Sequence, residues 1–305
     1  MDVLCLGESM VVLAPSPVGS LRHARETTLG VAGAESNVAI SLALLGADAA
    51  WRGKVGDDPF GHRILDVLRE AGVDCEGVVP DPDHPTGVYF KDPDPQGTTV
   101  HYYRKGSAAS TMRPGHLDGE PSPRILHLSG ITAALSPECH ALVRELLAGH
   151  ADDSPLVSFD VNYRPALWPV ETAAPILSEL ANAAGLVFVG LDEAETLWGC
   201  KTPDDVREVL PDPPYLVVKD GGNGVTLYSG SSIHFSAAEP VDIVEPVGAG
   251  DAFAAGFLYG RLQHASEEAC MRLGHLLAAG ALQTTGDLAA PPSPQTVRSI
   301  LEQRS

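Results

Sequence analysis

Short apolar runs alternate with helix-like segments along this chain, and this alternation limits the fold more than any other feature of the sequence. The runs are continuous rather than mixed with polar residues, which is typical of strands buried on both faces of a parallel sheet. The strand-like runs are 2–6, 49–53, 124–128, 155–160, 186–189 and 214–219. The helix-like segments are 36–45, 60–71, 136–149, 170–183, 203–210, 251–263, 266–281 and 293–302. The alternation predicts an α/β fold, a three-layer αβα sandwich in which helices cover both faces of a mainly parallel sheet.

Two regions depart from the alternation and are typical of β-hairpins. They are 11–32 and 86–106, and in the second a turn with Pro and Gly at 92–97 separates two β-prone arms. We expect these strands to form a small lid inserted into a single domain that covers residues 1–305. An antiparallel extension of the main sheet is the alternative.

The composition is ordinary for a globular protein, and the charge narrows the possible partners. Of the 305 residues, 44% are hydrophobic and 20% are charged, so the chain can bury a large core. Forty acidic against 20 basic residues give a net charge of −20, which disfavours general binding to nucleic acid or to an anionic membrane. A phosphate ligand must therefore be bound by a local site.

The cysteines and the N-terminal residues indicate in which cellular compartment the protein works. The five cysteines form no C-x-x-C pair, so we expect neither a zinc site nor a disulfide framework. An apolar run begins at Val3 without a preceding basic region, and no stretch of about 18 apolar residues occurs. We expect no signal peptide, no membrane span and a cytoplasmic location.

The segment 246–251, Pro-Val-Gly-Ala-Gly-Asp, combines small residues with a carboxylate at the start of a predicted helix. Because Gly248, Ala249 and Gly250 carry no large side chain, backbone N–H groups can converge there on an anion, and the helix dipole adds positive potential. Asp251 would hold a carboxylate beside this cradle. A cradle for negative charge and a proton acceptor are the minimal requirements for phosphoryl transfer to a hydroxyl. Alternatively, the segment is only a turn in which Asp251 caps the helix.

Polar residues at the predicted carboxyl ends of strands form further candidate sites, because ligands of such sheets bind there. If the chain stays extended after the strand at 155–160, then Asp160, Asn162 and Arg164 point the same way into the crevice. A turn in which Asp and Asn act as caps is the alternative. The glycine loop 219–224 either passes close to a nucleotide or simply turns a hairpin.

Two more candidates come from the first helix and the second hairpin. Gly33 would let a ligand approach the backbone closely, and Asn37 offers both a donor and an acceptor. Arg104 could bind a carboxylate through two hydrogen bonds, or it could be a solvated residue at a sheet edge.

Five motifs together resemble the ribokinase-like (PfkB) sugar kinases over nearly the whole chain. In family order and spacing they are LGVAGAESNVAISLALLGA at 29–47, GKVGDDPFG at 53–61, DVNYRPALW at 160–168, VKDGGNGV at 218–225 and VGAGDAFAAGF at 247–257. Within the family, YYRKGSAAS at 102–110, PVGAGD at 246–251 and Gly286-Asp287 are most similar to kinases of 2-keto-3-deoxygluconate. The resemblance implies a ribokinase-like fold, with ATP and Mg²⁺ as cofactors and the terminal hydroxyl of a sugar acid as the phosphoryl acceptor.

The resemblance also implies roles for individual residues. Asp251 would be the base, and the N–H groups of Ala249, Gly250 and Asp251 would form the anion hole. The residues implied for the sugar acid are Gly33, Asn37, Tyr89, Tyr102, Arg104, Arg164, Asp251 and Asp287. The residues implied for the nucleotide are Asn162, Arg164, Glu193, Lys219, Gly221, Gly222, Gly224, Gly248, Ala249 and Gly250. Glu193 would hold Mg²⁺ through water, Arg104 or Arg164 would bind the substrate carboxylate, and paired lid strands would give a homo-oligomer.

Three positions depart from the family pattern. Val12 stands where fructokinase-like members carry an Asp for sugar hydroxyls, which favours a sugar acid as the substrate. Gly190 replaces the Asn of an Asn-x-x-Glu motif that contacts magnesium water, and 245–247 reads Glu-Pro-Val where many members have Asp-Thr-Thr, which weakens a monovalent-cation site. The alternatives are a fructokinase- or ribokinase-type kinase of a neutral sugar, and a non-catalytic protein that binds sugar or nucleotide.

Overall fold

The computed structural model describes residues 1–94, 97–148, 155–284 and 289–302, and within these ranges eight strands form the main sheet. Their order is β12-β11-β10-β9-β8-β7-β1-β4, and neighbours from β10 to β4 are parallel. The strands are β1 (Val3–Cys5), β4 (Ala49–Trp51), β7 (Ile125–Ser129), β8 (Leu156–Asp160), β9 (Leu186–Gly190), β10 (Tyr215–Asp220), β11 (Gly224–Ser229) and β12 (Ser232–Ala237). The predicted parallel sheet is confirmed, and the antiparallel strands β11 and β12 extend it beyond the six predicted runs.

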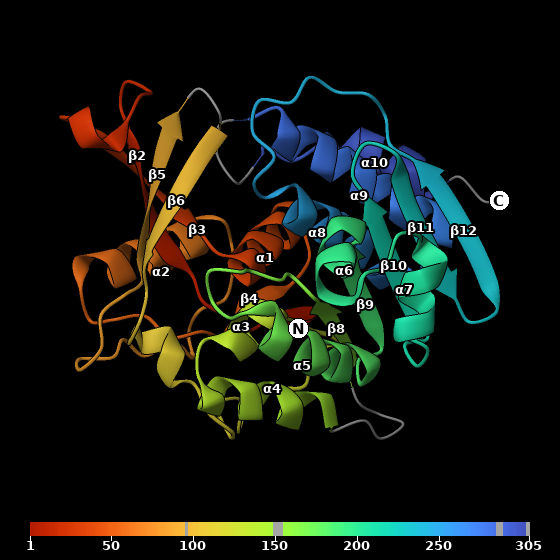
Figure 1. Cartoon of the computed structure of the whole chain (residues 1–305), viewed down its shortest axis with the longest axis horizontal. Coiled ribbons are helices and arrows are strands. Elements are labelled where there is room, and N and C mark those ends of the chain that lie inside the picture. The colour runs from red at the N-terminus through yellow and green to blue at the C-terminus, as the bar shows by residue number, and fades with distance from the viewer. Residues whose placement is uncertain (95–96, 149–154, 285–288, 303–305) are drawn as a thin grey trace.

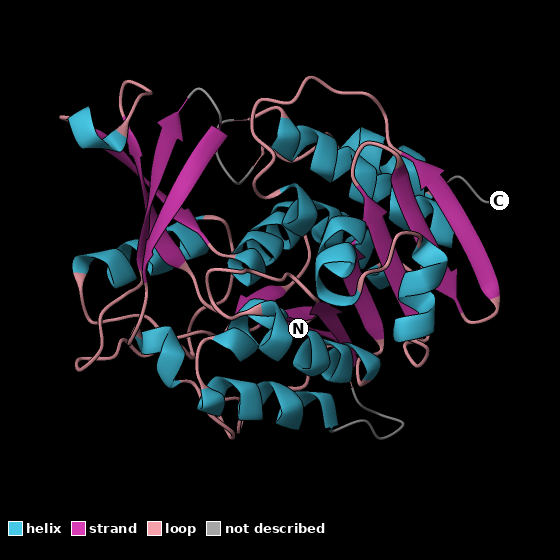
Figure 2. Cartoon of the chain, in the orientation of Figure 1, coloured by secondary structure: helices cyan, strands magenta, loops and turns pink. Residues whose placement is uncertain are grey.

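The two faces of the main sheet bury two apolar cores, because successive side chains of a strand point to opposite sides. In β9, Leu186 and Phe188 belong to one core, whereas Val187 and Val189 belong to the other. Helices covering the first core are α1 (Ala34–Leu44), α2 (Pro59–Glu70), α8 (Ala249–Leu262) and α9 (Glu267–Leu282). Helices covering the second are α4 (Pro137–Ala148), α5 (Val170–Asn182), α6 (Leu191–Trp198) and α7 (Pro203–Val209). Figure 2 shows these helices on both sides of the strands, as the sandwich prediction requires.

Four short elements complete the helical part of the described chain. They are α3 (Gly130–Ala134), α10 (Pro294–Leu301) and the 3₁₀ helices η1 (Leu21–His23) and η2 (Ala108–Thr111). The prediction lacked α3 and α6, and α1 and α8 each begin two residues earlier than predicted. Within the described ranges, every helix is too short or too polar to pass through a bilayer.

Glycines allow α8 to lie deep in the protein against α9. A Cβ added to Gly256 would come within 2.3 Å of the carbonyl oxygen of Leu273, and one added to Gly274 would clash with the ring of Phe253. At the start of α8, Gly248 has a φ of 84°, in the left-handed region that glycine adopts without strain. These glycines therefore let α8 and α9 pack closely and let the chain turn into α8 at Gly248.

The two predicted hairpin regions form a separate, smaller sheet rather than an extension of the main one. In the described residues this sheet has the order β3-β2-β5-β6, built from β2 (Met10–Pro15), β3 (Thr27–Ala32), β5 (Val88–Asp94) and β6 (Gly97–Tyr103). The pair β2–β5 is parallel and the other two pairs are antiparallel. In Figure 1 the smaller sheet stands to one side of the main sheet, beside α1 and α2. Its buried face carries a small apolar cluster around Met10 and Tyr89.

Candidate active site

A cavity of about 1570 Å³ lies where the smaller sheet, α8 and the carboxyl ends of β8, β9 and β10 meet. All the predicted site residues in the described ranges line this cavity, and Asp287 lies outside the described residues. They are Gly33, Asn37, Tyr89, Tyr102, Arg104, Asn162, Arg164, Glu193, Lys219, Gly221, Gly222, Gly224, Gly248, Ala249, Gly250 and Asp251. The fold thus brings together residues from seven separate segments at one site.

The first turn of α8 supplies the anion cradle. Helix N-termini leave backbone N–H groups without intrahelical partners, and here the turn begins at Ala249 and contains Asp251 as its third residue. A Cβ on Gly250 would lie 3.4 Å from Nζ of Lys219, so a lysine ammonium lies close to the cradle. The helix N-terminus and the Lys219 ammonium thus both contribute positive charge at this turn, although the chain as a whole is strongly acidic.

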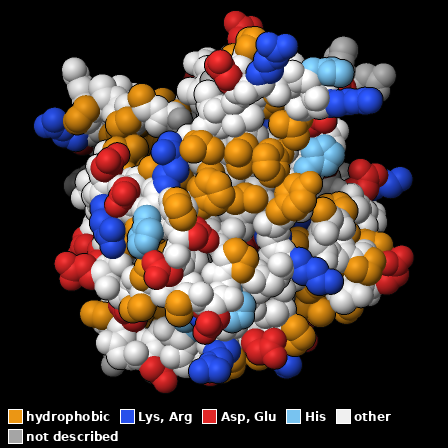
Figure 3. Space-filling view, turned by 90° about the vertical axis from the view of Figure 1, so that its left-hand side faces the viewer, with side chains coloured by type: hydrophobic (Ala, Val, Ile, Leu, Met, Phe, Trp, Pro, Cys, Tyr) orange, Lys and Arg blue, Asp and Glu red, His pale blue; other side chains and the backbone are white. Residues whose placement is uncertain are grey.

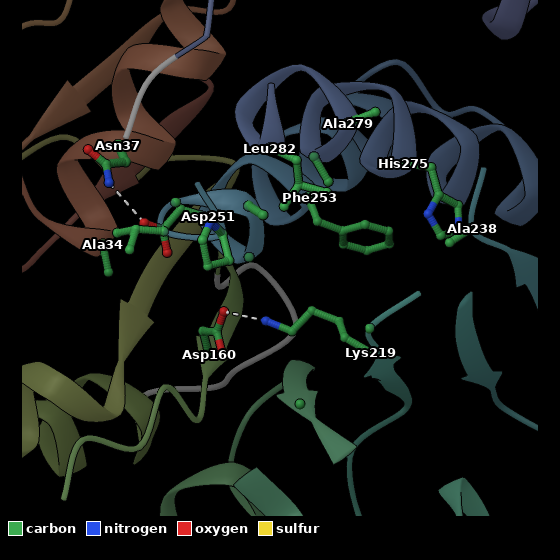
Figure 4. Close-up of a pocket in the computed structure, with 18 of the residues that line it drawn as sticks. Ala34, Asn37, Asp160, Lys219, Ala238, Asp251, Phe253, His275, Ala279 and Leu282 are labelled. Atoms are coloured by element: carbon green, nitrogen blue, oxygen red, sulfur yellow. Dashed lines mark hydrogen bonds and ion pairs between the residues drawn. The ribbon is translucent and has the colours of Figure 1, made fainter. Parts of the chain in front are cut away.

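Asp251 is held at the junction of α8 and α1. Nδ2 of Asn37 donates a hydrogen bond of 2.9 Å to Oδ2 of Asp251, as Figure 4 shows. Burial, together with the nearby carboxylate of Asp160, raises the pKa of Asp251 to about 7. A carboxyl with a pKa in this range can accept a proton at neutral pH, which is suited to general base catalysis.

A buried charge cluster lies on the other side of the cradle. Nζ of Lys219 is 3.0 Å from Oδ2 of Asp160, a residue that is 3% exposed. Burial and the Asp160 carboxylate raise the pKa of Glu193. Burial acts to lower the pKa of Lys219, but Asp160 and Glu193 outweigh it, and the pKa lies above its usual value. Lys219 therefore stays charged beside the cradle.

The segment after β8 reaches the cavity by a different route from the predicted one. The strand ends at Asp160, and Asn162 has a φ of 41°, so the chain does not continue in extended form. Asp160, Asn162 and Arg164 nevertheless all line the cavity. Oδ1 of Asp160 and Oδ1 of Asn162 are buried acceptors without a hydrogen-bond partner in the described part of the chain. Two unpaired acceptors in a cavity wall fit a ligand that brings donors or a hydrated cation.

Arg104 is not the solvated edge residue that the sequence left open. Its guanidinium forms a buried ion pair with Glu8, whose carboxylate also accepts a hydrogen bond of 2.6 Å from Oγ of Ser107. The Arg104 side chain is 9% exposed, and its guanidinium lies over the ring of Tyr102. By contrast, the Arg164 side chain is 47% exposed, and its nearest carboxylate oxygen, on Glu193, is 3.9 Å away. Of the two arginines predicted to bind a carboxylate, Arg104 is thus buried in an ion pair, whereas Arg164 is half-exposed and its ion-pair partner in the described residues is more distant.

Gly33 lines the cavity, and the structure shows that it also has a role in backbone packing. A Cβ there would lie 2.3 Å from the backbone oxygen of Glu8, so the glycine allows the backbone of the loop before α1 to pack against that of residue 8. Gly33 also caps α1, four residues before Asn37. It helps to place Asn37 opposite Asp251.

Several cavity residues were not predicted from the sequence. Glu8 pairs with the predicted residue Arg104, and only its position after an apolar strand could have drawn attention to it. The far end of the cavity is lined by α9, α10 and the segment after β12, including Leu276, Ala279 and Leu282. Figure 4 shows Phe253 near Leu282, and His275 farther from Asp251, beside Ala238. The sequence gives no signal for these residues, because the apolar residues of a cavity wall have the same pattern as those of any buried helix face.

An anion cradle, a carboxyl that titrates near neutrality and a buried ammonium are typical of enzymes that transfer a phosphoryl group to a hydroxyl. The comparisons with known proteins agree. Residues 1–294 match the family described as "pfkB family carbohydrate kinase", and the chain belongs to this family of carbohydrate kinases.

Individual relatives extend over nearly the whole chain. It is 35% identical to a 2-dehydro-3-deoxygluconokinase of Bacillus subtilis, over 99% of this chain and 95% of that protein. It is 32% identical to a 2-dehydro-3-deoxygluconokinase of Thermoproteus tenax, over 99% and 94% of the two chains. Among solved structures, a PfkB protein from Polaromonas sp. JS666 superposes with a TM-score of 0.88 at 32% identity, over 98% of this chain and 99% of that one. The ribokinase-like fold predicted from the motifs is confirmed.

Proposed function

We propose that the protein is an ATP-dependent kinase that phosphorylates the terminal hydroxyl of 2-keto-3-deoxygluconate, also called 2-dehydro-3-deoxygluconate, or of a closely related sugar acid. The observation that carries the proposal is the position of Asp251. Its carboxyl accepts a hydrogen bond from Asn37 and stands at the anion cradle, inside the cavity that the smaller sheet and the glycine loop share. The relatives named for this activity support the choice of substrate.

In this proposal the sugar acid lies at the end of the cavity formed by α1 and the smaller sheet. Gly33, Asn37, Tyr89, Tyr102, Arg104 and Arg164 line that end. Arg104 presents a guanidinium that contacts Glu8 and Tyr102, and Arg164 supplies a more exposed positive charge. The smaller sheet acts as the lid over this end.

The nucleotide lies at the opposite end. Lys219 and the turn between β10 and β11 flank its phosphates, and the apolar wall formed by α9 receives the base. The turn carries Gly221 and Gly222, and a Cβ on either would meet nothing within 4 Å, which leaves room beside the backbone. The cradle fits the phosphates of a nucleotide, and the unpaired acceptors on Asp160 and Asn162 fit a hydrated cation that accompanies them.

The cradle and Asp251 divide the chemistry of the transfer. Asp251 takes the proton from the acceptor hydroxyl, and the N–H groups at the start of α8 stabilise the charge on the transferring phosphoryl group. Lys219 adds positive charge beside them. When bound, ATP supplies the phosphoryl group and Mg²⁺ supplies charge neutralisation between its phosphates.

The magnesium site in this proposal rests on Glu193, acting through water. Its Oε2 already accepts a hydrogen bond of 3.0 Å from the backbone N–H of Gly190, and the buried oxygen of Asp160 lies in the same cavity wall. Buried carboxylates that repel each other are stabilised by a nearby divalent cation, so the donor set fits Mg²⁺. We propose no monovalent-cation site, because 245–247 reads Glu-Pro-Val where many family members have Asp-Thr-Thr.

A second copy of this chain is the partner we propose for the outer face of the smaller sheet. The strand register places Leu13 beside Leu29 and Phe90, and Phe90 contacts the ring of Tyr103. Tyr103 is 66% exposed, and Figure 3 shows hydrophobic side chains gathered on this side of the molecule. Exposed apolar patches of this kind mark interfaces. Light scattering of wild type and Tyr103→Glu tests the dimer, which we expect only for the wild type.

The function is tested by ADP release from ATP with a panel of acceptors. The panel contains 2-keto-3-deoxygluconate, its galactonate-derived epimer, fructose, ribose and buffer alone. We expect a kcat/KM for at least one sugar acid well above the values for the neutral sugars. A preference for fructose or ribose would favour a neutral-sugar kinase, and release with none of them would favour a non-catalytic binding protein.

A further inference from the structure

An ion pair joins the smaller sheet to the segment that leads into the cradle. Nζ of Lys91, on β5, is 3.0 Å from Oε1 of Glu245, which lies three residues before Gly248. The side chains are 9% and 17% exposed, so both charges are largely withdrawn from water. The two residues are far apart in sequence, and the described chain brings them together beside the cavity that Lys91 lines.

The segment around Glu245 is anchored from two sides. The backbone N–H groups of Val244 and Glu245 donate to the carbonyl oxygen of Leu282, at the end of α9. On the other side, the side chain of Glu245 is tied to β5 by its ion pair with Lys91. From Glu245 the chain passes through Pro246 directly to Gly248 and the cradle amides. Glu245 therefore lies only three residues before the first glycine of the anion cradle.

Stability alone does not account for this pair. Withdrawing two charges from water offsets most of their attraction, and a buried pair is often no more stabilising than apolar residues of the same size. What such a pair does provide is a fixed relative position, because either charge without the other is strongly unfavourable. Tyr89 and Lys91 are both buried on the inner face of β5, so the same face carries a predicted sugar contact and the tie to the cradle.

We infer that Lys91 and Glu245 are positioning residues, which hold the smaller sheet and the cradle in the relative arrangement that phosphoryl transfer requires. The inference rests on the proposed function for its kinetic consequence, although the mechanical tie can be measured without any substrate. A sugar acid bound beneath the smaller sheet would then meet a cradle whose amides are already placed.

The test uses Lys91→Met, Glu245→Gln and the double variant, with Lys91→Arg as the conservative change. The matched control is Arg144→Met and Glu179→Gln, which break an ion pair of 2.9 Å between exposed side chains on α4 and α5. For the proposed reaction we expect each single change to lower kcat by about fivefold to a hundredfold, with a smaller effect on KM for ATP. We expect kcat of the double variant to be no lower than kcat of the less active single variant. Lys91→Arg should retain most of the activity.

Hydrogen exchange of the segment 243–252, measured without substrate, gives a readout independent of catalysis. We expect faster exchange there in both single variants than in the wild type or the control variants. If Lys91→Met impairs turnover while Glu245→Gln leaves both turnover and exchange unchanged, Lys91 acts by direct contact with a ligand and the inference is wrong. Additive losses in the double variant would also overturn it. A wild type inactive on every sugar would contradict the proposed function, while the exchange data would still decide whether the tie exists.

Discussion

Asn37 and Asp251, 214 residues apart in the chain, meet through a hydrogen bond of 2.9 Å from Nδ2 to Oδ2. The bond ties the first turn of α1 to the first turn of α8, and so connects the half of the cavity near the smaller sheet with the half near the glycine loop. Burial raises the pKa of Asp251 to about 7, whereas the Asn37 hydrogen bond favours the carboxylate and partly offsets that effect. The balance leaves a base that titrates near neutral pH.

The pH dependence of kcat/KM should follow Asp251. Because the carboxylate is the form that accepts a proton, activity is lost as the pH falls through about 7, and kcat/KM should decrease about tenfold per pH unit below that point. The measurement is kcat/KM for the sugar acid from pH 5.5 to 8.5 at saturating ATP. A profile that stays flat across this range would contradict Asp251 as the base.

The same carboxyl should weaken the folded state at high pH. The pKa is about 7 in the folded protein against a usual value of 3.8, so between these values the folded state binds a proton that the unfolded state lacks. Stability contributed by this group therefore falls as the pH rises from about 4 to about 7. We expect Asp251→Asn to be more stable than the wild type at pH 8 and about equal to it near pH 4, by urea denaturation. Asp66→Asn, on the exposed side of α2, is the control, and its stability relative to the wild type should not change in this way between pH 4 and pH 8.

Removal of the Arg104 guanidinium should discriminate between acidic and neutral sugars. A charge-assisted hydrogen bond to a substrate carboxylate contributes about 1.5–3 kcal/mol, so Arg104→Ala should raise KM for the sugar acid by about tenfold to a hundredfold. KM for a neutral ketose should change much less. Steady-state kinetics with both substrates decide the point, and equal effects on the two would argue against carboxylate recognition. Glu8→Gln should produce the same selectivity change in weaker form, because it loosens Arg104 without removing it.

Gly222→Ala should report the path of the nucleotide. An added Cβ would meet nothing within 4 Å in the folded chain, so the melting temperature should be unchanged. If the phosphates of ATP pass beside this turn, KM for ATP rises while KM for the sugar stays the same. The control is Gly19→Ala, where there is equal space on a loop of the smaller sheet. An unaltered KM for ATP would place the nucleotide elsewhere.

The sequence predicts the layers of this fold and most residues of the site because both are encoded locally. The continuous apolar runs at 186–189 and 214–219 become β9 and β10, and the glycine-rich segment before Asp251 becomes the start of α8. In contrast, β12 alternates half-buried and exposed residues at the sheet edge, and α6 has only eight residues before Gly199 ends it in the left-handed conformation. Signals this short carry little weight without tertiary context.

Partners of the predicted residues could not be predicted, because they are set by contacts between distant segments. Nothing near Arg104 in the sequence indicates its ion pair with Glu8, and nothing near Lys91 indicates Glu245. The left-handed conformation of Asn162 likewise follows from the path that the chain must take after β8. Motifs identify which residues gather at the cavity, whereas their charge states depend on how the whole chain packs.

The most direct test of the account is the turnover of Asp251→Asn with 2-keto-3-deoxygluconate and ATP, measured with binding of both ligands by calorimetry. The substituted amide keeps an oxygen that can accept the hydrogen bond from Asn37 but cannot take a proton at neutral pH. We predict that kcat falls by about 10²–10⁴-fold while both ligands still bind. Turnover at the wild-type rate in a correctly folded Asp251→Asn variant would contradict the central claim.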